Sequence, residues 1–342
     1  MTTGIVKDTR YLGHDMGAYH VESPQRLEAI YKMIEGEIAF PLTVIEPRPA
    51  TEKELEFIHS PSYVKFIGQT AGKERTYLDP DTSTSANSYE AARLAAGGLL
   101  KAADLVMEGK IRNGFALVRP PGHHAEVDQA KGFCIFNNVA IAAEYLVRKH
   151  GLKRVLIADW DLHHGNGTQN AFYLRNDVLF FSTHQFPYYP GSGDWDEVGE
   201  EAGEGFTVNV PMSPGKTDEE YLFIYRNILG PIAAAYKPEF ILVSAGFDIY
   251  AGDPLGGMLV SAEGFGALAA ELLAMAGKLA QGRILFTLEG GYSLEGLADG
   301  VQEVLMQLAA QKTPPAIKTD ISITTRKEIS PVIDTQKRFW PL

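Results

Sequence analysis

Two carboxylates and one histidine in this chain could hold a catalytic metal ion. Asp161 and His163 are two residues apart in DWDLHHGNG, just after an apolar run, and Asp248 ends SAGFD after another run. Alternate side chains of an extended segment point the same way, so Asp161 and His163 can face one point. One histidine and two carboxylates suit a catalytic zinc, which would polarise a carbonyl and lower the pKa of a water. A DxH spacing taken alone fits a capping or buried polar role better.

Three further side chains could complete an acid–base site. His123 and His124 follow Pro-Pro-Gly, and Tyr292 follows Gly-Gly. One histidine would be a general base for water, and the other would adjust the charge or donate a proton. The tyrosine hydroxyl could donate a hydrogen bond to an oxyanion. Taken alone, each motif fits a simple turn, so the prediction depends on their combination.

The elements that must position these residues alternate between short apolar runs and longer helical stretches. Several runs are apolar without polar alternation, which is typical of parallel strands buried on both faces. The alternation predicts an open α/β sandwich. The expected strands are Gly4–Val6, Leu42–Ile45, Phe115–Val118, Val155–Ala158, Val178–Ser182, Phe206–Val210, Phe240–Ser244 and Ile284–Leu288, and the expected helices are Pro24–Ile34, Ser85–Met107, Asn137–Lys149, Asp218–Tyr236, Ala262–Ala280 and Leu294–Ala310.

Four motifs follow expected strands, where an open parallel sheet builds its sites. They are PPGHH, DWDLHHGNG, SAGFD and LEGGY, so their loops should meet at one edge of the sheet. No repeat or flexible linker divides the chain, which favours one domain over residues 1–311. The tail 312–342 is polar with an apolar end at Phe339, Trp340 and Leu342. We expect it to dock on the body or on a second subunit, giving a possible homo-oligomer; a disordered tail is the alternative.

Composition narrows the classes of partner. The net charge of the 342 residues is −12, which argues against direct nucleic-acid binding. It would suit a cationic substrate, or it only keeps the protein soluble. Cys134 is the one cysteine, so an intramolecular disulfide and a CxxC zinc site are excluded. No apolar run has membrane length and the start lacks a signal-peptide pattern, so no membrane partner and a cytoplasmic location are expected.

Five segments together resemble the histone deacetylase and acetylpolyamine amidohydrolase superfamily. They are HVESPQRLEAI at 20–30, RPPGHHAEVDQAKGFCIFNNVAIAA at 119–143, DWDLHHGNGTQNAF at 159–172, SAGFD with DPL at 244–255, and LEGGYSLEGLA ending at 298. GFCIFNN and DWDLHHGNGTQ are similar to class II enzymes and their bacterial relatives. The resemblance implies an arginase/deacetylase-like open sandwich, with a mainly parallel eight-stranded sheet and helices on both faces.

The resemblance also implies a role for each matching residue. The zinc ligands would be Asp161, His163 and Asp248, and the catalytic residues would be His123, His124, Asp159, Asn166 and Tyr292. Asp159 would orient His123, and Asn166 would partner His124, where class I members carry Asp. Tyr292 stands where weakly active class IIa vertebrate enzymes carry His, so an active enzyme is expected. A potassium ion would bind at Asp159, Asp161, His163, Ser182 and Thr183.

The substrate channel follows from the same matching. Phe133, after Gly132, and Phe186 would sandwich the methylene chain of an acyl-lysine. Asp81 and His20 would lie on the rim. Leu255 stands where the polyamine-specific vertebrate relative carries an acidic residue, which favours acyl-lysine.

The predicted reaction is hydrolysis of an acyl amide, N-ε-acyl-lysine foremost, to acetate and a free amine. An acetylated polyamine is the alternative substrate. An arginase-like two-metal hydrolase and a non-catalytic acyl-lysine binder are rivals. The arginase reading needs additional ligands, and the binder reading predicts loss of a catalytic residue, whereas all are present.

Overall fold

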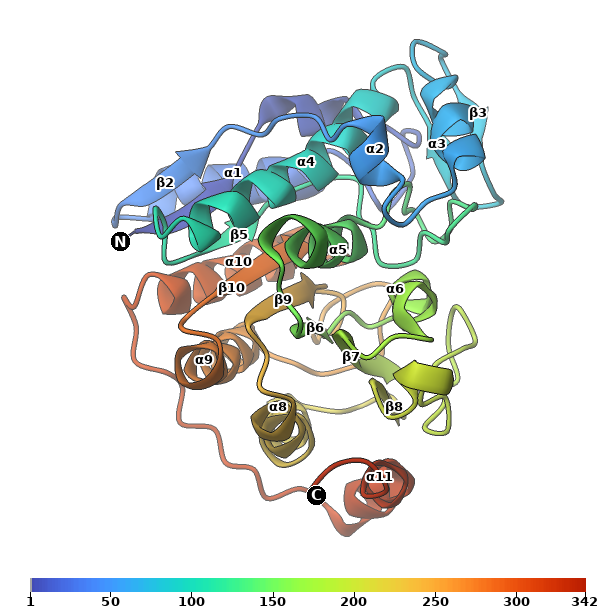
Figure 1. Ribbon diagram of the computed structural model, residues 1–342. Helices are drawn as coiled ribbons and strands as arrows, with labels where there is room; N and C mark the ends of the chain where they lie inside the picture. The colour runs from blue at the N-terminus through green and yellow to red at the C-terminus, as the bar shows by residue number, and fades with distance from the viewer. Residues whose placement is uncertain (1) are drawn as a thin grey trace.

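The computed structural model describes residues 2–342 and has one large parallel sheet (Figure 1). The strand order is β2-β1-β5-β10-β9-β6-β7-β8, and all seven pairings are parallel. A short antiparallel pair, β3 and β4, lies outside this sheet. The strands are β1 Thr3–Val6, β2 Leu42–Ile45, β3 Thr76–Tyr77, β4 Ser83–Thr84, β5 Asn113–Ala116, β6 Val155–Asp159, β7 Val178–Gln185, β8 Thr207–Met212, β9 Phe240–Ala245 and β10 Ile284–Leu288.

The predicted α/β sheet is confirmed, and its burial explains the sequence pattern. Every residue of β6, β7, β9 and β10 is buried, so these strands read as continuous apolar runs. Several strand boundaries differ from the expectation: β5 starts at Asn113, two residues early, and β7 continues beyond Ser182 to Gln185. The Asn113 amide accepts from the Thr3 hydroxyl and donates to the carbonyl of Leu308, which satisfies a polar side chain inside the sheet.

Helices cover both faces of the sheet (Figure 1). On one face α4 packs on α5 and α5 on α6; on the other, α1, α10, α9 and the α7–α8 pair pack in series. The short helices α2 and α3 pack on one another, and α2 also contacts α5. The helices are α1 Gln25–Glu37, α2 Glu52–Leu55, α3 Pro61–Gly68, α4 Ser88–Met107, α5 Asn138–His150, α6 Asn166–Phe172, α7 Asp218–Ile224, α8 Gly230–Tyr236, α9 Ala262–Leu279, α10 Leu294–Leu308 and α11 Ile323–Gln336.

The helix expected over 218–236 is interrupted. A π-helical turn at Tyr225–Leu229 separates α7 from α8. Pro231 lies in the first turn of α8 and lacks the N–H that an uninterrupted α-helix would use, so the local hydrogen-bond register changes before it.

The segment after α10 runs as an extended chain past α9 and α8 and ends in α11 (Figure 1). Helix α11 contacts β8, the edge strand of the sheet. The Gln336 side chain donates to the carbonyl of Thr207 at 3.2 Å, and the Trp340 indole donates to that of Gly205 at 2.8 Å. Ile329 of α11 is also buried. The tail therefore covers an edge that would otherwise expose unpaired backbone groups.

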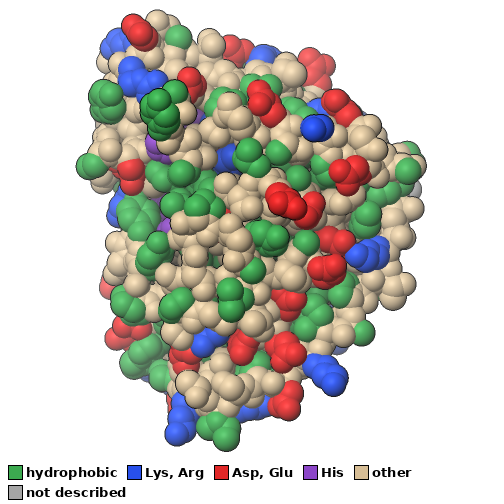
Figure 2. Space-filling model, turned by 180° about the vertical axis from the view of Figure 1, so that it is seen from behind, with side chains coloured by type: hydrophobic (Ala, Val, Ile, Leu, Met, Phe, Trp, Pro, Cys, Tyr) green, Lys and Arg blue, Asp and Glu red, His purple; other side chains and the backbone are tan. Residues whose placement is uncertain are grey.

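Two surface properties bear on partners. Within residues 2–342, no helix has the length and apolar character needed to cross a membrane. On the face in Figure 2, Lys and Arg side chains are scattered among acidic ones and form no continuous basic patch.

Candidate active site

Four loops meet beyond the carboxyl ends of four adjacent strands. Asp161 and His163 follow β6, Asp248 follows β9, Tyr292 follows β10, and the tandem histidine motif at 123–124 follows β5. The order β5-β10-β9-β6 places these strand ends side by side. The four loops therefore lie at one edge of the sheet, as the sequence predicts.

Asp161, His163 and Asp248 form a buried cluster of potential metal ligands. The Nδ1 atom of His163 lies 3.1 Å from Oδ1 of Asp161 and 3.1 Å from Oδ2 of Asp248. The ligand atoms of the three all lie within 4.8 Å of one another. Burial and the nearby charge of Asp161 raise the pKa of Asp248 to about 7. One nitrogen and two oxygens are the donor set of a catalytic zinc with open positions.

Backbone donors hold the two carboxylates in place. Oδ2 of Asp161 accepts from the N–H of Gly290 at 2.8 Å, and Oδ1 of Asp248 accepts from that of Leu162 at 2.9 Å. Gly290 is needed here, because an added Cβ would lie 2.2 Å from Oδ2 of Asp248 and 2.7 Å from Oδ2 of Asp161.

The Gly290→Ala variant is therefore expected to lose metal and to fall about 100-fold or more in turnover, because both carboxylates must move. Metal content and acetate release measure this, with circular dichroism reporting the fold. Gly277→Ala is the matched control, since a Cβ there meets no atom within 4 Å. Full metal content in the Gly290 variant would show that the cluster tolerates displacement.

The tandem histidines lie beside this cluster in different charge states. Nδ1 of His123 is 3.0 Å from Oδ2 of Asp159, and the two imidazole rings are 4.0 Å apart. Burial opposes a charge on His123, but Asp161 and Asp159 outweigh it and raise its pKa to about 10. Burial and the charges of His123 and His163 hold the pKa of His124 well below its usual value. The pair therefore combines one imidazolium with one neutral imidazole.

The hydrogen bonds of His124 determine its tautomer. Nδ1 of His124 lies 2.7 Å from the amide oxygen of Asn166, which can only accept, so Nδ1 carries the proton. The other ring nitrogen, Nε2, is then left with a lone pair. His124 lines the cavity, so it is the group able to accept a proton there.

Tyr292 is held through its backbone and its ring. Oδ2 of Asp253 accepts from the N–H of Tyr292 at 2.6 Å and from that of Ser293 at 3.0 Å. The Arg26 guanidinium lies 5.1 Å from the centre of the Tyr292 ring and donates to the carbonyl of Gly291 at 2.6 Å. The hydroxyl is thus the free end of a fixed side chain that lines the cavity.

The cavity above the cluster has a volume of about 220 Å³. Most of the predicted channel and catalytic residues line it: Asp81, His123, His124, Gly132, Phe133, His163, Leu255 and Tyr292. Phe133 presents an edge to Tyr292, with ring centres 5.9 Å apart. Gly132 has φ +55, and a Cβ there would lie 2.4 Å from the His124 ring, so the wall needs glycine at this point.

Phe186 is not a wall of this cavity, which corrects the sequence prediction. Its N–H donates to the carbonyl of Met212 and continues the β7–β8 pairing, and the residues just after it that line the cavity are Tyr188 and Tyr189. The Tyr189 ring centre lies 5.1 Å from that of His124. The sequence signal for these residues is the aromatic pair in FPYYP, two positions beyond Phe186.

His20 lies behind the wall instead of on the cavity surface. Its ring centre is 4.7 Å from that of Phe133, edge to face, and its Nε2 is 3.1 Å from the carbonyl of Asp81. The N–H of Phe133 donates to the Thr82 hydroxyl at 2.9 Å. The rim loops therefore brace the aromatic wall.

The residues of the predicted potassium site lie on neighbouring strands. Ser182 of β7 pairs with Asp159 of β6, and the Thr183 hydroxyl contacts the carbonyl of Asp159 at 3.5 Å. The chain that leaves β6 at Asp159 leads directly to Asp161 and His163. The potassium ion itself stays a prediction.

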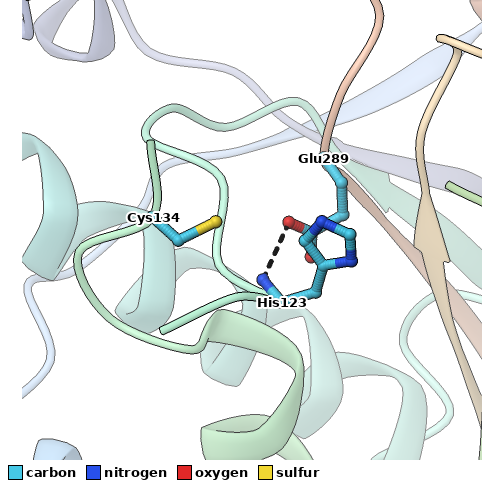
Figure 3. A group of neighbouring side chains, drawn as sticks. All are labelled: His123, Cys134 and Glu289. Atoms are coloured by element: carbon cyan, nitrogen blue, oxygen red, sulfur yellow. Dashed lines mark hydrogen bonds between the residues drawn. The ribbon is translucent and has the colours of Figure 1, made fainter. Parts of the chain in front are cut away.

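Glu289 is a buried residue of the site that sequence reasoning missed. Figure 3 shows its carboxylate beside His123 and the Cys134 thiol. The carboxylate accepts from the N–H groups of Gly122 at 2.6 Å and His123 at 3.2 Å, and from the Ser244 hydroxyl at 3.1 Å. Because its oxygens are occupied, Glu289 anchors the tandem-histidine loop and is a poor metal ligand. Burial also raises the pKa of Cys134 well above its usual value, which keeps it a thiol.

A second buried network explains the HVESPQR motif. Glu22 is fully buried, and both of its oxygens accept from Arg119, while Arg26 donates to it at 3.1 Å. Arg26 also donates to the carbonyl of Glu289 at 2.6 Å, so the network supports the loop that carries Tyr292.

Replacing Glu22 with Gln is expected to lower the free energy of unfolding by about 3–5 kcal/mol, because two buried guanidinium groups lose their counter-charge. Urea denaturation measures it. Glu35→Gln breaks the exposed Lys7–Glu35 pair and should change stability by under about 1 kcal/mol. Equal stabilities for the two variants would contradict this account.

The sheet and the ligand cluster define an α/β protein with candidate metal ligands at the carboxyl ends of its strands. The model of the histone deacetylase domain matches residues 20–308. A probable deacetylase of Archaeoglobus fulgidus is 40% identical over 299 residues, covering 86% of this chain and 83% of that protein. The polyamine deacetylase HDAC10 of Mus musculus is 42% identical over 311 residues, covering 85% of this chain but 45% of that protein.

The fold agrees with these sequence matches. The crystal structure of the HDA15 HD domain superposes with a TM-score of 0.93 at 39% identity, covering 99% of this chain and 95% of that one. The chain belongs to the histone deacetylase family, and it is a hydrolase of the deacetylase class. The predicted family and enzyme class are confirmed.

Proposed function

We propose that this protein is a zinc-dependent deacetylase that hydrolyses N-ε-acetyl-lysine in proteins or peptides to acetate and free lysine. The observation that carries the proposal is the Asp161–His163–Asp248 cluster below a cavity lined by His124 and Tyr292. Family membership supports the deacetylase reaction.

Zinc held by the three ligands would polarise the acyl carbonyl and lower the pKa of the attacking water. Nε2 of His124 takes the proton from this water, as its tautomer allows. The Tyr292 hydroxyl donates to the oxyanion that develops on the carbonyl oxygen. His123, whose Nδ1 lies 3.0 Å from Oδ2 of Asp159, would add positive charge beside that oxyanion when protonated. The proton accepted by His124 then passes to the leaving amine.

The cavity walls favour acyl-lysine as substrate. Phe133 and Tyr189 line it and suit the methylene stem of a lysine. Leu255 lines the cavity as an apolar side chain and offers no carboxylate for a distal ammonium group. Asp81 also lines the cavity and could accept from substrate amides.

An acetylated polyamine is the second candidate. The similarity to a polyamine deacetylase and the net charge of −12 favour it. An arginase-like pair of metals is disfavoured, because the other ligand group found in residues 2–342 is His123, Cys134 and Glu289, whose carboxylate is already hydrogen-bonded.

The test is turnover of an acetyl-lysine peptide beside N8-acetylspermidine and N-acetylputrescine by the zinc-loaded protein. We expect the highest kcat/KM with the peptide. A preference for either polyamine would replace acyl-lysine by the second candidate. No turnover of any substrate would contradict the deacetylase proposal.

Potassium at the Asp159–Thr183 region, a cytoplasmic location and a homo-oligomer belong to the same proposal. The potassium ion would brace the loop that carries Asp161 and His163. Added potassium should therefore raise the turnover or the thermal stability of protein purified in sodium-free buffer. If neither changes, the proposed potassium site is wrong.

A further inference from the structure

Glu126 lies behind the catalytic residues, two positions after His124. Its carboxylate accepts from the side-chain amide of Asn166 at 2.5 Å and from that of Asn170 at 3.0 and 3.1 Å. Glu126 and Asn170 line a separate outer groove of about 220 Å³ and do not line the catalytic cavity. Any effect of Glu126 on the reaction must therefore pass through another residue.

The carboxylate determines which way the Asn166 amide faces. A carboxylate only accepts, so the NH₂ group of Asn166 must face Glu126, and this group also donates to the carbonyl of His124 at 3.3 Å. The amide oxygen is then left for Nδ1 of His124, 2.7 Å away. A flipped amide would set its oxygen 2.5 Å from a carboxylate oxygen. It would also donate to Nδ1 and move the histidine proton to Nε2.

We propose that Glu126 is a positioning residue that fixes the proton-accepting tautomer of His124 through Asn166. The proposal rests on the proposed function, because it matters only if His124 accepts a proton. In the flipped arrangement Nε2 carries the proton and His124 cannot act as the base.

The kinetic test is a set of four variants with the acetyl-lysine peptide. Glu126→Ala frees the Asn166 amide and is expected to lower kcat about 10- to 100-fold, with KM within about twofold, because neither residue lines the cavity. Glu126→Gln keeps an acceptor and should lose less. Asn166→Asp places a second carboxylate against Glu126 and should also lose kcat strongly. The double variant Glu126→Gln/Asn166→Asp reverses donor and acceptor and should recover about tenfold over Asn166→Asp alone.

The control is Asp128→Asn, the same change of charge on the exposed part of the same loop, and it should behave as the native protein. Melting temperature and metal content identify a variant that fails to fold. Rescue of kcat in the double variant supports the proposal only where Asn166→Asp alone keeps its melting temperature and metal content, since relief of carboxylate repulsion would also reverse a structural loss.

A direct measurement is the ¹⁵N NMR spectrum of the histidine rings, which reports the tautomer without turnover. We expect an unprotonated Nε2 for His124 in the native protein and a mixture in Glu126→Ala. An unchanged tautomer and unchanged kcat in Glu126→Ala would overturn the proposal. Absence of turnover in the native protein would instead remove the proposed function on which it rests.

Discussion

The Asp248→Asn variant is expected to lose its zinc and at least about 10³-fold of its turnover while keeping its fold. Both oxygens of Asp248 are used: one accepts from the N–H of Leu162, and the other faces Nδ1 of His163. An amide keeps the shape but removes the charge, and it offers zinc a much weaker ligand. Metal analysis of the purified variant and acetate release from an acetyl-lysine peptide measure the two effects.

Asp196→Asn is the control, since Asp196 is exposed and far from the cluster in sequence. It should keep full zinc and turnover. A variant of Asp248 with full zinc and near-native turnover would show that the metal site lies elsewhere.

Tyr292→Phe is expected to lower kcat about 10²- to 10³-fold, with zinc content unchanged and KM little affected. Removal of one oxyanion donor typically has an effect of this size, because the bond forms fully only in the transition state. The Phe ring should keep the contacts with Arg26 and Phe133, which involve the ring and not the hydroxyl. Steady-state kinetics with the same peptide measures it.

Tyr77→Phe, an exposed tyrosine on β3, is the matched control and should leave kcat unchanged. If Tyr292→Phe raised KM alone, the hydroxyl would bind the ground state of the substrate and would not stabilise the oxyanion.

The sheet could be predicted from the sequence because its inner strands are buried on both faces. Runs such as Val155–Ala158 and Ile284–Leu288 are apolar at almost every position. The helical stretches between the runs are long enough to connect parallel strands, whereas antiparallel strands can be joined by short turns. The tail helix α11 could not be predicted in the same way. Its sequence is largely polar, and it is held by contacts with β8 that lie more than a hundred residues away in the chain.

The ligand cluster could also be predicted, because strand ends and the resemblance place Asp161, His163 and Asp248 together. Residues that act through tertiary hydrogen bonds could not. Glu126 and Asn166 are 40 residues apart, and no local sequence pattern predicts the hydrogen bond between their side chains. The sequence predicts Phe186 as the second aromatic wall, whereas Tyr189 lines the cavity, because β7 extends to Gln185 and strand ends are poorly defined by sequence.

The most direct test of the central claim is removal and return of the metal. The protein is stripped with a chelator, dialysed, and titrated with zinc while acetate release from an acetyl-lysine peptide is followed. We predict no turnover in the stripped protein and full recovery at one zinc per chain, as one ion held by Asp161, His163 and Asp248 requires. Turnover that survives stripping, or that needs two metal ions per chain, would contradict the account.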